Sequence, residues 1–157
     1  MEVEVYFLKY SFPCAFIANQ RGVINFEEFK RLEDAAINNK VLPREFLEKV
    51  FVMAFGRIQK LADELGKDKW NFDVIKEYFI TRHNDIIDQG FSSYAKAPES
   101  LKNLCRIHKA KVLEIRDDFL IVEYGGNRKR TVMKSLVPGV SIGDSVSIHY
   151  GYAVEIL

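Results

Sequence analysis

The chain has few of the features that define secreted or membrane proteins. Its 157 residues include only two cysteines, Cys14 and Cys105, too few for the disulfide framework of a small secreted domain. No apolar run approaches the ~20 residues that a membrane span needs. The N-terminal segment carries two glutamates before its first lysine and lacks a small-residue cleavage site, unlike a signal peptide. We therefore expect a reduced, cytoplasmic protein without membrane contact.

Strong net charge and catalytic motifs are also missing. The formal charge is +1, which gives no general attraction to nucleic acid or to acidic lipid. The sequence has no glycine-rich phosphate loop, no nucleophile elbow and no paired-carboxylate signature, so we expect no enzymatic activity. Hydrophobic residues make up 48% of the chain, which is enough for a packed core and argues against global disorder.

The N-terminal region has the apolar spacing of helices. Over residues 1–90, apolar side chains recur at three- and four-residue steps, which predicts a bundle of four or five helices. Asn25 and Glu28 have the spacing of a capping box, and Asn71 is a second expected N-cap. One long helix is predicted between Pro43 and Gly66. In residues 91–103, serines and a proline interrupt the periodicity, so we expect a linker there.

From Cys105 onward the apolar period becomes two. Five short strand candidates follow one another, with the sequences KVLEI, FLIVEY, RTVMKSL, SVSIHY and AVEIL. Gly125 and Gly126 provide the positive φ angles that a hairpin turn needs. Short strands at this tight spacing are typical of a small barrel or sandwich, here over residues 104–157. A barrel of roughly fifty residues buries little surface, so we expect it to lean on the helical domain.

Motifs in residues 104–157 resemble those of a known family. Residues 104–112 read Leu-Cys-Arg-Ile-His-Lys-Ala-Lys-Val, where the family begins Met-Cys-Leu-Ala-Ile-Pro-Gly-Lys-Val. The family's Phe-Gly-Gly-x-Arg turn is matched by residues 124–128, Tyr-Gly-Gly-Asn-Arg. Its ending, Val-Gly-Asp-x-Val-x-Val-His-x-Gly-Phe-Ala, is matched by residues 142–153, Ile-Gly-Asp-Ser-Val-Ser-Ile-His-Tyr-Gly-Tyr-Ala. This region therefore resembles the HypC/HupF family of nickel–iron hydrogenase maturation chaperones.

The resemblance implies an α+β protein in which the helical bundle is followed by a five-stranded OB-like β-barrel. It implies an accessory chaperone of metallocentre assembly that is not an enzyme and that carries or presents iron transiently, with no other cofactor. The expected partners are an iron-centre assembly protein and a hydrogenase large-subunit precursor. The implied metal-binding residues are Cys105 and His149. The implied partner-binding residues are Cys105, Arg106, Ile107 and His108.

The residues themselves leave two other functions open. Cys105 is internal, whereas the family's cysteine becomes N-terminal, and this difference favours a protein-interaction adaptor that has lost the iron chemistry. The basic run NRKR at residues 127–130, with Lys109 and Lys111, suits an OB-like module for single-stranded nucleic acid, although the near-neutral net charge argues against it. The plainer alternatives are an ordinary small apolar residue at Cys105 and a half-buried strand residue at His149.

If Cys105 binds a metal, its thiol must be accessible and must ionise near neutral pH. Arg106, His108 and Lys109 place positive charge beside it, which favours the thiolate. We therefore expect Cys105 to be at least partly exposed, close to His149 and more reactive than Cys14, which follows Pro13 on an apolar helical face.

Overall fold

The computed structural model describes residues 1–90 and 92–157. These residues form two compact units, Met1–Arg82 and His83–Leu157. Residue 91, the first residue of the expected linker, lies outside the described residues. Among the residues described, no helix is both long and apolar enough to cross a membrane.

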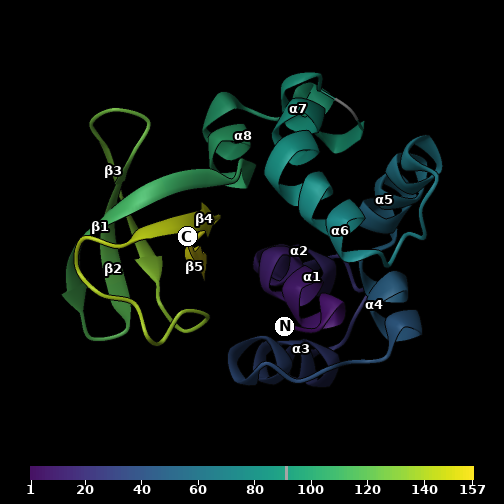
Figure 1. Ribbon diagram of the computed structural model, residues 1–157, viewed down its shortest axis with the longest axis horizontal. Helices are drawn as coiled ribbons and strands as arrows, with labels where there is room; N and C mark the ends of the chain where they lie inside the picture. Colours follow the sequence, from purple (N-terminus) through teal and green to yellow (C-terminus); the bar gives the residue numbers. More distant parts are fainter. Residues whose placement is uncertain (91) are drawn as a thin grey trace. The chain divides into compact units, whose positions relative to one another are not determined.

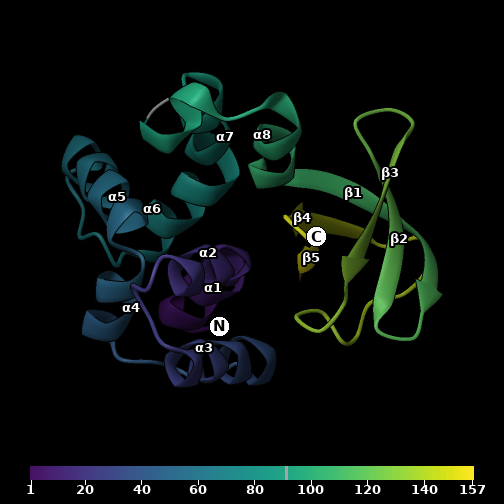
Figure 2. The same cartoon turned by 180° about the vertical axis from the view of Figure 1, so that it is seen from behind.

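The first unit is helical, as predicted (Figure 1). In Figure 1 and in the reverse view of Figure 2, α1, α2 and α3 lie side by side. Phe7 of α1 is fully buried, and its ring lies 4.6 Å from that of Phe55 and 5.7 Å from that of Trp70. Aromatic packing thus dominates the core of this unit. The elements are α1 (Val3–Ser11), the 3-10 helix η1 (Phe12–Cys14), α2 (Ala15–Gln20), α3 (Phe26–Asn38), α4 (Arg44–Val50), α5 (Val52–Leu65), α6 (Phe72–Glu77) and the π-helical segment η2 (Tyr78–Arg82).

Local sequence signals explain most helix ends in this unit. The Asn25 side chain accepts the backbone N–H of Glu28 at 2.8 Å, and the Glu28 carboxylate accepts that of Asn25 at 3.0 Å, which confirms the capping box. Asn71 caps α6 as expected. The single helix predicted between Pro43 and Gly66 is wrong, because Phe51 leaves the helical conformation and separates α4 from α5. Its ring instead packs edge-on against Phe7 at 5.5 Å, a tertiary contact that sequence periodicity does not register.

The second unit begins with helices and continues as strands. Its elements are α7 (His83–Asp88), the 3-10 helix η3 (Ser92–Lys96), α8 (Glu99–Cys105), β1 (His108–Arg116), β2 (Phe119–Tyr124), β3 (Arg128–Met133), β4 (Ser145–His149) and β5 (Tyr152–Ile156). The expected linker therefore contains η3 and most of α8. Pro98 marks the start of α8, because its carbonyl accepts the N–H groups of Leu101 and Lys102.

The five strands close into a barrel in the order β1-β2-β3-β5-β4. All neighbours pair antiparallel except β3 and β5, which pair in parallel through Met133 and Tyr152. This order, with one parallel seam, is that of the OB fold. The predicted hairpin turn is confirmed, since Gly125 and Gly126 have φ angles of +56° and +93°. The α+β fold class, with a small five-stranded barrel after a helical bundle, is therefore confirmed.

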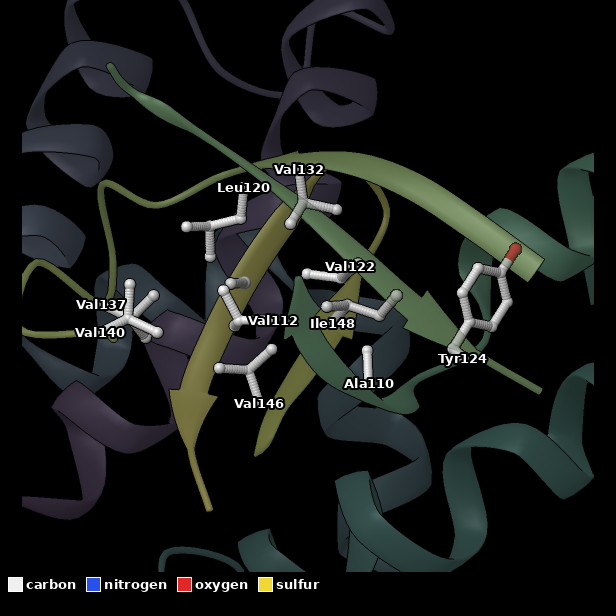
Figure 3. Close-up of a cluster of buried hydrophobic side chains, with 11 residues drawn as sticks. Ala110, Val112, Leu120, Val122, Tyr124, Val132, Val137, Val140, Val146 and Ile148 are labelled. Carbon is white, nitrogen blue, oxygen red and sulfur yellow. The ribbon is translucent and has the colours of Figure 1, made fainter. Parts of the chain in front are cut away.

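Alternating residues of the strands fill the barrel. Leu120 and Val122 of β2 are fully buried and point inward beside Val132 of β3 and Val146 of β4 (Figure 3). Tyr124 lies at one end of this row, with its hydroxyl directed away from the apolar cluster. The interior is thus packed with aliphatic side chains, as expected for a barrel of this size.

Candidate functional site

Cys105 is the last residue of α8, and two residues separate it from the start of β1. Its side chain is only 1% exposed, and its Sγ lies 2.6 Å from the hydroxyl oxygen of Tyr150, in a hydrogen bond. The backbone joins the same two segments, because the Tyr150 N–H donates to the carbonyl of Leu104 at 2.9 Å. The end of α8 and the turn between β4 and β5 therefore enclose the thiol.

The expectation that Cys105 is exposed and readily ionised is wrong in this conformation. Burial raises the pKa of the thiol and outweighs the hydrogen bonds with Tyr150 and Tyr94 and the charge of Arg106, which lower it. The charge of Arg106 is not free to stabilise the thiolate. The guanidinium instead pairs with Asp88 at 2.6 Å and Glu99 at 2.7 Å. Cys14, by contrast, is partly exposed.

Tyr150 lies at the centre of the site, and the sequence reasoning did not select it. It occupies the turn after β4 with a φ of +50°, a left-handed conformation that few non-glycine residues adopt. Its carbonyl accepts from Nη1 of Arg130 at 3.3 Å, so its amide, carbonyl and hydroxyl all have partners. The sequence signal that could have indicated Tyr150 is its place between His149 and Gly151, since a turn at a glycine fixes the direction of the neighbouring side chain.

His149 is buried, and its ring packs against that of Tyr150. Its side chain is 1% exposed, and its ring packs 5.3 Å from the ring of Tyr150. On another side it packs edge-to-face at 5.0 Å against His83, a buried residue of α7. Cys105 and His149 thus contact the same tyrosine. In the part of the chain that the structure describes, no three or more His, Cys, Asp or Glu side chains cluster to form a metal site.

The three other expected partner-binding residues are held by neighbouring segments. Arg106 makes the two ion pairs above and its side chain is 18% exposed. Ile107 is 9% exposed, and the side chain of Asn84 on α7 bonds to both its N–H and its carbonyl at 2.8 Å. His108 is half-buried and its Nε2 donates to the carbonyl of Asn103 at 3.1 Å. In this conformation residues 106–108 are therefore held in place by hydrogen bonds and ion pairs with neighbouring segments.

The side chain of His108 lies in a positively charged environment. Burial lowers the pKa of His108, and the charges of Arg130, Arg106 and Arg128 lower it further, against the opposing effect of the Asn103 hydrogen bond. Its ring packs 4.7 Å from Tyr124, which sequence reasoning also did not select. The Tyr124 hydroxyl receives hydrogen bonds from Asn103 at 3.1 Å and from Arg130 at 3.0 Å.

The fold and this junction define a small OB-type barrel that holds a buried thiol where a helix enters its first strand. Residues 109–157 match the model of the HupF/HypC family, which confirms the resemblance of the C-terminal region. The match covers about a third of the chain and includes His149, whereas residues 105–108 precede it. No curated protein and no solved structure matches the chain significantly.

Proposed function

We propose that this protein is an accessory chaperone of metallocentre assembly that acts by protein–protein contact. The observation that supports the proposal most is the closed five-stranded barrel, whose residues 109–157 match the HupF/HypC family. In this proposal the protein works in the cytoplasm and catalyses no reaction. Its barrel recognises an iron-centre assembly protein and a hydrogenase large-subunit precursor.

Iron enters this proposal as cargo, and the described conformation does not fit it. A thiolate and a neutral imidazole are suitable ligands for low-valent iron. However, the Cys105 thiol is buried, its protonated form is favoured, and Tyr150 occupies its hydrogen-bonding position. We therefore restrict iron carriage by Cys105 and His149 to a form in which the thiol has separated from Tyr150. Partner binding does not depend on that form.

The burial of Cys105 favours a second function, a protein-interaction adaptor that no longer handles iron. A buried thiol with a raised pKa is a poor metal ligand and a poor nucleophile, and it behaves as a small apolar residue. Under this alternative the barrel keeps its protein partners, and Cys105 contributes only packing.

Co-expression with a hydrogenase large-subunit precursor tests both functions. The chaperone proposal expects the precursor to co-purify with the tagged full-length chain, and failure to co-purify contradicts both functions. Iron in the purified complex, measured by mass spectrometry, then separates the two. If Cys105→Ser abolishes bound iron and Cys14→Ser does not, the chain carries iron. If Cys105→Ser keeps the precursor and wild type holds no iron, the chain is an adaptor.

A further inference from the structure

The balance of charge differs between the two ends of the barrel. The β2–β3 hairpin and the facing start of β1, residues 122–130 and 108–112, carry five basic residues and one carboxylate, Glu123. The basic residues are Lys109, Lys111, Arg128, Lys129 and Arg130. We call these five residues the basic end. The opposite end carries both signs of charge, with Asp117, Asp118 and Glu114 beside Arg116, which pairs with Glu114, and Lys134.

The strand register brings the basic residues together. Lys111 of β1 lies opposite Glu123 of β2, which lies opposite Lys129 of β3, so these three side chains share one row on the barrel. Arg128 lies opposite Tyr124 in the next position. Four of the five basic residues are exposed, and Arg130 is part-buried.

The one carboxylate of these segments, Glu123, lies in the row between Lys111 and Lys129 but forms no ion pair with either lysine. Among the described residues, no carboxylate lies within ion-pair distance of any of the five side chains of the basic end, whereas Arg106, Arg116 and several lysines elsewhere are paired. A cluster of unpaired cations at one end of a small barrel costs electrostatic free energy, which an acidic partner recovers.

The basic end is also built onto α8 and is not a loose turn. Arg130 Nη2 donates to the Asn103 carbonyl at 3.3 Å and to the Tyr124 hydroxyl at 3.0 Å, while its guanidinium lies 4.6 Å from the centre of the Tyr124 ring. Arg128 Nη1 donates to Oδ1 of Asn103 at 3.4 Å. These bonds fix the direction of the hairpin, so a partner meets a surface that is already organised.

The aromatic residues of the barrel favour a protein partner over nucleic acid. Single-stranded nucleic acid binds OB barrels through exposed aromatic rings on which bases stack. At the basic end, Tyr124 is only 7% exposed, and the ring of His108 packs against it. Phe119, which is 46% exposed, lies at the other end of β2. A carboxylate-rich protein segment needs only the charges.

We infer that the basic end of the barrel is a docking surface for an acidic segment of a partner protein. The inference rests on the proposed function only in assuming that the barrel binds proteins. The surface is joined to the helix that ends at Cys105, because Asn103 of that helix accepts hydrogen bonds from Arg128 and Arg130.

The test uses the full-length chain and fluorescence anisotropy with two labelled probes, a peptide of about ten glutamates and an oligothymidine of about ten nucleotides. Arg128→Glu with Lys129→Glu reverses two exposed charges at the basic end. Arg116→Glu with Lys134→Glu makes the same change in net charge at the other end. We expect the first pair to weaken peptide binding at least about tenfold and the second pair less than about twofold. Binding should weaken as salt rises from about 50 to 300 mM.

Three results would overturn the inference: no peptide binding by wild type, equal losses for the two variants, or tighter binding of oligothymidine than of the peptide. The variant Arg128→Gln with Lys129→Gln removes the two charges without reversing them and controls for misfolding. We expect it to weaken peptide binding less than the charge reversal does and to leave the melting temperature unchanged. Because this assay contains no hydrogenase precursor, its failure leaves co-purification with the precursor unaffected, so the two proposals fail separately.

Discussion

Asn84 of α7 bonds both backbone groups of Ile107, with its amide nitrogen donating to the carbonyl and its oxygen accepting the N–H, each at 2.8 Å. The side-chain amide thus imitates a neighbouring strand at the point where the chain leaves α8 and enters β1. We expect Asn84→Ala to lower the free energy of unfolding by about 2–3 kcal/mol, since two part-buried backbone groups lose their partners.

Urea unfolding checks this prediction. Asn38→Ala is a matched control, because the Asn38 amide bonds an exposed carboxylate on its own helix, and a loss below about 0.5 kcal/mol is expected there. Equal losses of unfolding free energy in the two variants would show that the two hydrogen bonds between Asn84 and Ile107 add no stability of their own.

The two cysteines should label in the opposite order to that expected from sequence. Cys14 is partly exposed, while Cys105 is 1% exposed with a raised pKa. We expect iodoacetamide to modify Cys14 at least about tenfold faster in the folded protein, because Cys105 reacts only after local opening. Peptide mass spectrometry measures both rates, and in concentrated urea they should converge. Faster labelling of Cys105 in the native protein would show that the thiol is open in solution.

Removal of the Tyr150 hydroxyl should raise the thiol pKa. The hydrogen bond between Cys105 and Tyr150 lowers the pKa of Cys105 against the larger effect of burial. In Tyr150→Phe that compensation is lost, so thiolate forms at a higher pH than in wild type. The Cβ chemical shift of ¹³C-labelled cysteine, followed by NMR in a Cys14→Ser background, reports the titration. Tyr124→Phe is the control, since that hydroxyl bonds Asn103 and Arg130. Identical curves for Tyr150→Phe and wild type would contradict the prediction.

His108 should make the fold less stable in mild acid. Its folded pKa is lowered, so between the folded value and the unfolded value of about 6.5 the unfolded chain binds more protons. The contribution of His108 to stability is therefore complete above about pH 6.5 and is lost as pH falls below it. We expect His108→Gln to reduce the fall in unfolding free energy between about pH 7 and pH 5. An unchanged slope in the variant would show that other groups control this pH range.

Local chemistry made part of the fold predictable. The capping box at Asn25 and Glu28, the cap at Asn71 and the turn at Gly125 and Gly126 each depend on residues within four positions of one another. The period of two located all five strands, and the parallel β3–β5 seam belongs to a barrel topology that the family resemblance implied. The caps, the turn and the strands were accessible because the chain specifies them over short distances, whereas the order of the strands came from the resemblance.

Features that depend on distant contacts were not predictable in the same way. Phe51 interrupts a helix and packs against Phe7, forty-four positions earlier in the chain. Cys105 is buried because Tyr150 folds back onto it, and the charge of Arg106 is neutralised by Asp88 and Glu99. The sequence predicted Cys105 and His149 as neighbours but did not indicate Tyr150, which contacts both of them in the structure. Such tertiary partners leave no local pattern.

The bond between Cys105 and Tyr150 also sets an order of events during synthesis. The two residues are 45 positions apart, so the thiol leaves the ribosome well before the hydroxyl that covers it. At about 5–20 residues per second, this interval lasts several seconds. Because Tyr150 joins β4 to β5, it reaches the thiol only when these last strands pair and complete the barrel. The newborn chain thus presents an uncovered cysteine that the finished protein buries, and a molecule that must contact this sulfur has its easiest access during that interval.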